Sequence, residues 1–223
     1  MTGVELVVVD DAQAVAAAVA DRLVAAARAG GHIALTGGTT PEQAYKNAAR
    51  LEPDWGNVEL WWSDERCVPP DDDLSNYALA KRTLLDNLEH GPKNVHRIKG
   101  ELGKAAAAED YAQELGDLAF DFELLGMGKD GHVASLFPNA PTLSQPGRVL
   151  PAEPGLDPFV DRVTLSIPAL NSARTILFAL AGADKADAAY RAFGAAPNRQ
   201  TPASLVRATT AILDRAAAAK LSP

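Results

Sequence analysis

The chain has 223 residues, of which 47% are hydrophobic and 22% are charged, and its formal net charge is −8 at pH 7. This length and composition suit one globular domain spanning 1–223 and differ from those of disordered or fibrous chains. The acidic balance argues against nucleic acid and against anionic membranes as partners, because both require a concentrated basic face. No apolar run approaches the roughly 20 residues that span a bilayer, and no secretion signal is recognisable, so we expect a cytoplasmic protein.

Metal and disulfide chemistry find little support in the sequence. The single cysteine, Cys67, cannot form an internal disulfide, which agrees with a reducing compartment and excludes a cysteine-rich zinc site. Consecutive acids at 71–73 lie between prolines and are typical of a solvated run. We therefore predict no metal.

Strand-like and helical segments alternate along the chain. We expect strands at 5–10, 32–35, 58–62, 120–125, 163–166 and 176–180. We expect helices at 12–29, 41–51, 75–88, 105–115, 184–193 and 214–221. This alternation predicts an α/β fold with a mainly parallel sheet flanked by helices on both faces, and a proline-rich surface excursion at 138–158. In such sheets ligands bind beyond the carboxyl ends of the strands, so the loops that follow strands should carry the chemistry.

The loop after the second strand predicts a helix N-terminus that can bind an anion. Pro41 fits the first helical position, Thr40 can cap it, and Gln43 completes a capping box. Gly37 and Gly38 let backbone N–H groups approach a ligand where the helix dipole favours a negative charge. A tight turn before a well-capped helix explains the same glycines, and no Walker lysine follows them.

The loop after the third strand, WSDERCVPP, places charged side chains at a strand's carboxyl end. Arg66 can grip an oxyanion with two hydrogen bonds, and Asp64 could steer a proton or a substrate hydroxyl. A solvated charged turn is the alternative interpretation. The position directly after an apolar strand favours the functional one.

The loop after the strand at 120–125, LGMGKDGHVASLFP, is the most informative segment. Its glycines match the dinucleotide-binding pattern, but Asp130 places a carboxylate where a pyrophosphate needs neutral backbone, and Pro138 comes too soon for a long helix. The glycines rather bend the chain so that Asp130 and His132 reach one cavity. Histidine suits proton transfer near neutral pH, and backbone N–H groups can stabilise an oxyanion, whereas Ser135 lacks the G-x-S-x-G setting of a nucleophile. A lone histidine on the surface or in the core is the alternative.

Taken together, these loops resemble the 6-phosphogluconolactonase family, within a wider group that includes glucosamine-6-phosphate deaminases. The matching segments are 36–41 (TGGTTP), 62–70 (WSDERCVPP) with 75–77 (SNY), 124–138 (LLGMGKDGHVASLFP) and, more weakly, 162–171 (RVTLSIPALN), 182–186 (GADKA) and 202–206 (PASLV). Deaminases of the group usually have an aromatic residue where this chain has Arg66 and a glutamate where it has Phe137. Both differences favour the lactonase.

The resemblance implies an open, Rossmann-like sheet of the glucosamine-6-phosphate deaminase/ribose-5-phosphate isomerase type. It implies cofactor-free hydrolysis of 6-phospho-D-glucono-1,5-lactone to 6-phospho-D-gluconate, a step of the oxidative pentose phosphate pathway, by a monomer or small homo-oligomer. The site residues it implies are His132 as general base with Asp130, Asp64 as a further carboxylate, and Gly37, Gly38, Thr39, Arg66, Lys185 and Arg162 around the phosphate and ring. A sugar-phosphate isomerase or deaminase, and a non-catalytic sugar-phosphate sensor, remain as alternatives.

Overall fold

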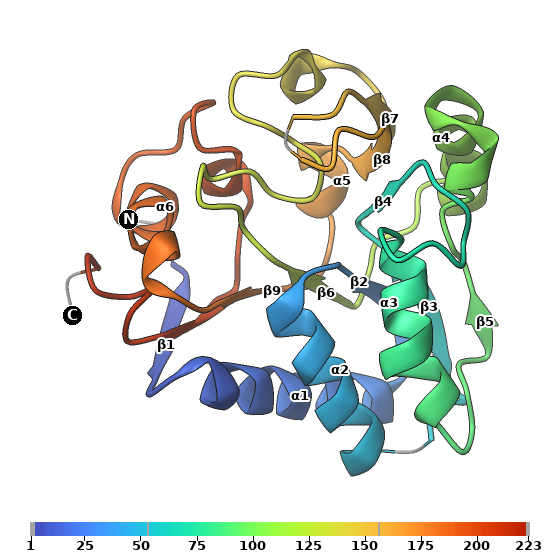
Figure 1. Cartoon of the computed structure of the whole chain (residues 1–223), viewed down its shortest axis with the longest axis horizontal. Coiled ribbons are helices and arrows are strands. Elements are labelled where there is room, and N and C mark those ends of the chain that lie inside the picture. Colours follow the sequence, from blue (N-terminus) through green and yellow to red (C-terminus); the bar gives the residue numbers. More distant parts are fainter. Residues whose placement is uncertain (1–2, 53, 156, 222–223) are drawn as a thin grey trace.

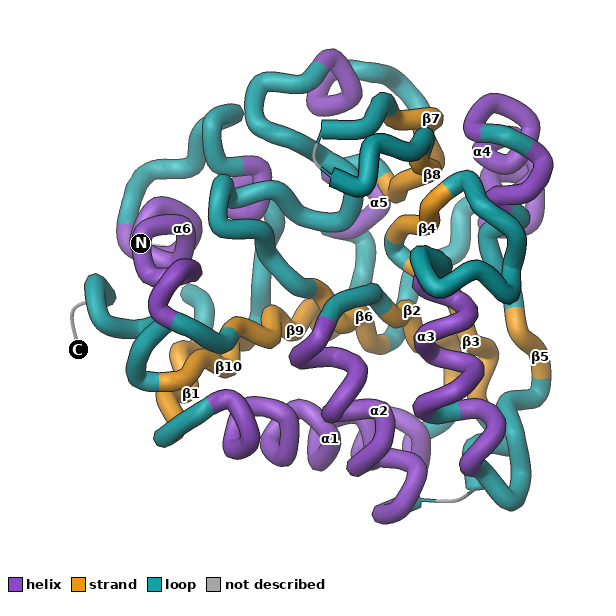
Figure 2. Tube along the Cα trace, viewed as in Figure 1, coloured by secondary structure: helices purple, strands orange, loops and turns teal. Residues whose placement is uncertain are grey.

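A computed structural model describes residues 3–52, 54–155 and 157–221 of the chain. Its centre is a parallel sheet in the order β1-β10-β9-β6-β2-β3-β5 (Figures 1 and 2). The strands are β1 (Glu5–Val9), β2 (Gly31–Leu35), β3 (Val58–Trp62), β5 (Asn94–Val95), β6 (Phe122–Leu125), β9 (Thr175–Leu180) and β10 (Thr210–Asp214). All residues of β6 and all but the first residue of β9 are buried, because both faces of a parallel sheet are covered.

Helices cover both faces of this sheet, as the sequence predicted. They are α1 (Ala12–Ala29), α2 (Thr39–Leu51), α3 (Asn76–Thr83), α4 (Lys104–Leu115), α5 (Ile167–Leu170) and α6 (Ala186–Ala189). Figure 1 shows α1 and α2 below the sheet and α4, α5 and α6 above it. The longest helix, α1, begins where the Asp11 carboxylate accepts a hydrogen bond from Ala14 N at 2.9 Å, and it ends at Gly30 with a positive φ of 73°. No helix in the described part of the chain is long and apolar enough to cross a membrane.

A second, antiparallel sheet stands beside the carboxyl ends of the parallel strands. It consists of β4 (Asp64–Arg66), β8 (Arg162–Leu165) and β7 (Val149–Ala152) in the order β4-β8-β7. Ser63 joins the two sheets, because its N–H donates to Leu35 O at 2.9 Å and its carbonyl accepts from Leu165 N at 2.8 Å. The charged segment after β3 is therefore a strand and not a loop, and the excursion at 138–158 contains β7.

Three expected helices differ from the structure. The helix expected at 75–88 ends as α3 at Thr83 and is followed by a 3₁₀ turn at Leu85–Asn87. The segment expected as a helix at 214–221 contributes only Asp214 to β10 and continues in turns, in which Asp214 O accepts from Ala218 N at 2.9 Å and Asp214 Oδ1 accepts from Ala217 N at 2.7 Å. An isolated helix of so few residues is marginal in water. The helix expected at 184–193 is divided into a 3₁₀ turn, α6 and a π turn.

The expected cap of α2 is also wrong. The helix begins at Thr39, two residues earlier than predicted, and Gly38, with φ 116°, occupies the capping position. None of the described side chains forms a capping hydrogen bond there, so neither Thr40 nor Gln43 builds the expected capping box. The first N–H groups of α2 consequently remain available to a ligand.

Candidate active site

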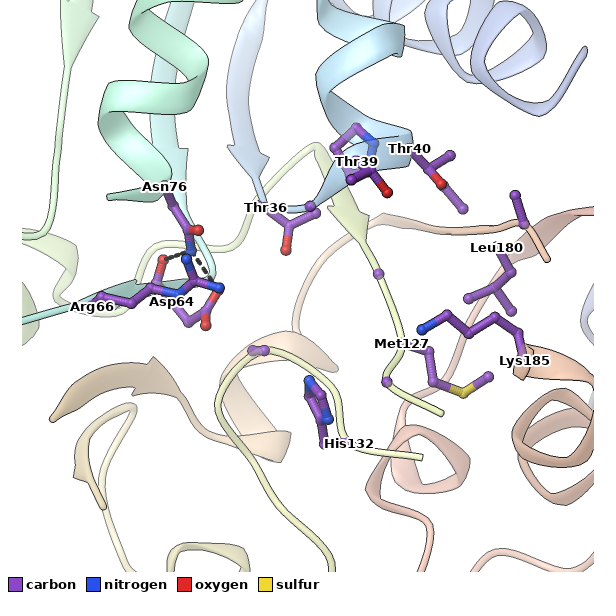
Figure 3. Close-up of a pocket in the computed structure, with 18 of the residues that line it drawn as sticks. Thr36, Thr39, Thr40, Asp64, Arg66, Asn76, Met127, His132, Leu180 and Lys185 are labelled. Atoms are coloured by element: carbon purple, nitrogen blue, oxygen red, sulfur yellow. Dashed lines mark hydrogen bonds between the residues drawn. The ribbon is translucent and has the colours of Figure 1, made fainter. Parts of the chain in front are cut away.

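A cavity of about 240 Å³ opens where β2, β4, β6 and β9 end (Figure 3). Its walls come from the start of α2, the loop after β6, the small sheet, the start of α3 and the segment after β9. All but one of the predicted site residues line it, namely Gly37, Gly38, Thr39, Asp64, Arg66, His132, Arg162 and Lys185. Asp130 is the exception.

Asp130 lies behind the imidazole of His132. Its Oδ1 is 2.7 Å from His132 Nδ1 and also accepts a hydrogen bond from His132 N at 3.2 Å. A carboxylate two residues before a histidine in a tight turn folds back onto the ring, so the expectation that Asp130 itself reaches the cavity is wrong. Burial by itself would raise the pKa of Asp130, but the hydrogen bond and the charge of His132 outweigh it and lower that pKa.

The glycines of the loop after β6 make room for this pair. A Cβ at Gly128 would lie 2.0 Å from His132 Nδ1. Gly131 has φ 95°, and a Cβ there would lie 2.8 Å from Thr201 Cγ2. Hydrogen bonds of 2.9 Å from Gly131 N to Gly128 O and 3.0 Å from Gly128 N to His132 O close the turn. The glycines thus shape a turn around a histidine, as the sequence indicated.

Asp64 points into the cavity with its carboxylate held from two sides. Ser135 Oγ donates to Asp64 Oδ2 at 2.7 Å, and Asn76 Nδ2 donates to Asp64 Oδ1 at 3.1 Å. A Cβ at Gly37 would lie 2.0 Å from Asn76 Oδ1, so this glycine gives Asn76 its place. Sequence reasoning missed both donors: it rejected Ser135 only as a nucleophile and noted Asn76 only as part of a matching segment.

Glu65 does not belong to the cavity, because alternate side chains of a strand point to opposite faces. It is buried and accepts hydrogen bonds from Ser75 Oγ at 2.9 Å, Asn76 N at 2.7 Å and Tyr77 N at 2.8 Å. Burial raises the pKa of Glu65, and these hydrogen bonds act in the opposite direction. The carboxyl group therefore anchors the start of α3 and, through it, Asn76.

Cations line two sides of the cavity. Figure 3 shows Arg66 beside Asp64 on one side and Lys185 on the other, with His132 between them. Nε of Arg66 and Nε of Arg162 are buried without a hydrogen-bond partner among the described residues. Lys185 belongs to the 3₁₀ turn Ala183–Lys185, and its side chain is 25% exposed. This local basic cluster, together with the start of α2, suits an anionic ligand in an otherwise acidic protein.

The described residues contain no group of three or more His, Cys, Asp or Glu side chains placed to hold a metal ion. The groups at hand are a histidine–aspartate pair, a second carboxylate and three cations. Such a set can transfer a proton and stabilise negative charge.

Comparison with known proteins identifies the family of the chain. A family model described as glucosamine-6-phosphate isomerases/6-phosphogluconolactonase matches residues 10–214. The chain belongs to this family. A family relative named 6-phosphogluconolactonase from Streptomyces coelicolor is 36% identical over 246 residues, covering 97% of this chain and 94% of the relative. Another of that name, from Mycobacterium tuberculosis, is 37% identical, with 95% and 96% covered.

Solved structures of the family share the fold. The crystal structure of devB protein superposes with a TM-score of 0.88 at 33% identity, covering 98% of this chain and 100% of that one. The 6-phosphogluconolactonase from Trypanosoma cruzi gives 0.85 at 25% identity, with 99% and 97% covered. A monomeric glucosamine-6-phosphate deaminase gives 0.85 at 20% identity, a likeness that concerns the fold alone. The expected family and sheet type are thereby confirmed.

Proposed function

We propose that this chain hydrolyses 6-phospho-D-glucono-1,5-lactone to 6-phospho-D-gluconate, with His132 as the general base. The observation that carries the proposal is the imidazole of His132, fixed by Asp130 at 2.7 Å, facing a cavity bordered by cations. Relatives that align over nearly all of both chains are named 6-phosphogluconolactonase, which supports the same reaction.

In the proposed mechanism Asp130 keeps the imidazole in the productive tautomer. Its carboxylate accepts a hydrogen bond from Nδ1–H, so Nε2 is unprotonated and free to act as a base. Nε2 removes a proton from water while the water oxygen attacks the lactone carbonyl carbon. Cavity N–H donors stabilise the oxyanion that forms. The bond from this carbon to the ring oxygen then breaks, the ring oxygen receives the proton from His132, and a carboxylic acid is released that ionises in water.

The phosphate and the ring are held between the cations and the start of α2. Arg66, Arg162 and Lys185 supply positive charge, and the uncapped N–H groups after Gly38 supply donors. Asp64, oriented by Ser135 and Asn76, accepts a hydrogen bond from a ring hydroxyl. Asp130 acts through His132 and is a positioning residue.

Phe137 supports hydrolysis over isomerisation or deamination. Its ring lies 5.0 Å from the imidazole of His132, centroid to centroid, and 5.7 Å below the Arg162 guanidinium. Deaminases of the group carry a glutamate at this position, where it assists ring opening. An apolar ring here cannot donate or accept that proton.

We also propose that the enzyme works in the cytoplasm, without a cofactor, as a monomer or small homo-oligomer. Its phosphorylated substrate is charged and cannot cross an apolar bilayer unaided, so enzyme and substrate belong in one compartment.

The decisive experiment is an assay of the purified chain on freshly generated lactone, with and without a chelator. The wild type should hydrolyse the lactone in both conditions, and His132→Ala should reduce the rate to the uncatalysed background while keeping the wild-type circular dichroism spectrum. Full activity in His132→Ala would show that another group is the base. Ammonia release from glucosamine 6-phosphate would favour the deaminase, and tight binding without turnover would favour the sensor.

A further inference from the structure

One charged side chain near the site has no part in the mechanism above. Arg191 lies in the π turn η5 (Tyr190–Gly194), which continues α6 (Ala186–Ala189) and the 3₁₀ turn that carries Lys185. The segment 183–194 therefore has a cavity-lining cation at its start and a second cation near its end. Turns of the π type are rare, and they often occur at functional sites.

The guanidinium of Arg191 contacts the backbone of the turn 128–132, which carries the Asp130–His132 pair and is called the catalytic turn below. Its Nη2 donates to Lys129 O at 3.4 Å and to Asp130 O at 3.3 Å. Its Nε donates to Thr201 Oγ1 at 3.2 Å. Lys129 O and Asp130 O are two successive carbonyls of the turn that ends in His132.

The same turn is fixed to the C-terminal part of the chain by neighbouring contacts. Ala203 N donates to Gly131 O at 3.0 Å, and Gly131 packs so closely on Thr201 that a Cβ would not fit. Thr201 is fully buried. Arg191 thus joins its own segment, 183–194, to the catalytic turn and to the segment around Thr201.

We propose that Arg191 is a positioning residue that keeps the Asp130–His132 pair aligned and links this alignment to the cation Lys185. The inference rests on the proposed function and deepens it. Nη2 of Arg191 donates to both carbonyls while Nε donates to Thr201, so the planar fork of the guanidinium bridges two segments, whereas an ammonium group acts as a single point. Without the fork, water replaces it at both carbonyls, and the turn gains freedom to move the imidazole. A shift of about 1 Å in a catalytic group can cost on the order of 100-fold in rate.

The test compares Arg191→Ala and Arg191→Lys with a matched control, Arg199→Ala. Arg199 also donates to a loop carbonyl, Ala140 O at 3.4 Å, but it does not line the cavity. We expect Arg191→Ala to lower kcat about tenfold or more with KM changed less than about threefold, because the phosphate contacts remain. Added guanidinium ion should restore part of the activity, Arg191→Lys should restore little, and Arg199→Ala should match the wild type.

A second readout does not depend on turnover. The Nδ1–H signal of the His132 imidazole in nuclear magnetic resonance spectra, assigned by its loss in His132→Ala, should shift or broaden in Arg191→Ala and stay unchanged in Arg199→Ala. Wild-type kcat together with an unchanged imidazole signal in Arg191→Ala would overturn the inference while leaving lactone hydrolysis intact. If the wild type fails to hydrolyse the lactone, the proposed function fails, and the imidazole signal still decides the role of Arg191. If Arg191→Ala does not fold, the same two measurements on Arg191→Lys decide it.

Discussion

Arg66 and Arg162 are direct cross-strand partners in the antiparallel pair of β4 and β8, with both side chains at the cavity. Two guanidinium groups in this position repel each other, and Nε of each lacks a partner among the described residues. Burial and the charge of Arg66 lower the pKa of Arg162. The pair is unfavourable in the empty protein and becomes favourable when an anion lies between or beside the two groups.

Replacing Arg162 by glutamine should therefore weaken substrate binding without lowering the stability of the fold. We expect Arg162→Gln to raise KM for the phosphorylated lactone about tenfold or more, while the free energy of unfolding stays equal or rises, because the repulsion is removed. Inorganic phosphate should raise the melting temperature of the wild type more than that of the variant. The exposed Arg174, changed to glutamine in the same way, serves as the control. A large loss of stability in Arg162→Gln with an unchanged KM would mean that the pair is structural.

Asp130→Asn tests the positioning of the imidazole and its pH dependence. The amide nitrogen can take the place of the acceptor and favour the wrong imidazole tautomer, so kcat should fall about 100-fold or more. Since the folded pKa of Asp130 lies below its ordinary value of 3.8, the interaction stabilises the fold above that value and is lost as the pH falls through the folded pKa. Urea unfolding should give the wild type a higher free energy of unfolding than Asp130→Asn at neutral pH, and this difference should shrink below about pH 4. A difference that is constant down to pH 2 would contradict this account.

Much of the site could be recognised from the sequence because its loops follow apolar strands. Gly37, Asp64 and His132 are distant in the chain, yet they meet because the strands before them are parallel and end at one edge. The bounds of α1 were also predicted correctly, since Asp11 and Gly30 mark its two ends locally. The ends of this helix depend only on neighbouring residues in the sequence.

The features that sequence reasoning missed depend on contacts between distant segments. Ser135 and Asn76 are short polar side chains whose importance appears only when both are seen to hold Asp64. The alanine-rich segment 215–221 has helix-forming residues, but it forms turns anchored at the end of β10, where Asp214 Oδ1 accepts from Ala217 N at 2.7 Å. The role of Asp130 behind the ring likewise follows from the fold of the turn, which composition does not reveal.

Gly128→Ala should disable the site with little damage elsewhere. The new Cβ would lie 2.0 Å from His132 Nδ1 and 2.5 Å from Asp130 Oδ1, so one of these side chains must move. We expect kcat to fall about 100-fold or more, with a melting temperature only a few degrees lower, because the clash involves two partly exposed side chains. Gly91→Ala, where nothing lies within 4 Å of the added Cβ, should behave as the wild type. Wild-type kcat in Gly128→Ala would show that the imidazole position in the structure is not the active one.

The carboxyl group of Glu123 allows the effect of burial in the core on stability to be tested. This residue of β6 is fully buried, and neither carboxyl oxygen has a hydrogen-bond partner among the described residues. Burial raises its pKa well above the ordinary 4.5, so the folded protein holds the group as a neutral acid. The unfolded chain ionises at Glu123 above about pH 4.5, whereas the folded chain stays protonated there until the pH reaches its higher pKa. The free energy of unfolding therefore falls between these two pKa values, by about 1.4 kcal/mol per pH unit.

Glu123→Gln cannot ionise, so its stability relative to the wild type should increase as the pH rises above about 4.5. Glu123→Leu should show the same increase and, in addition, exceed Glu123→Gln by about 1–3 kcal/mol, because it removes the unpaired polar atoms as well. The measurement is urea unfolding at several pH values, with Glu109→Gln on the exposed face of α4 as the matched control, which should show no such trend. If the difference between Glu123→Gln and the wild type is the same at pH 5 and pH 8, the carboxyl group has the same pKa in the folded and unfolded chains, and burial cannot be holding it neutral.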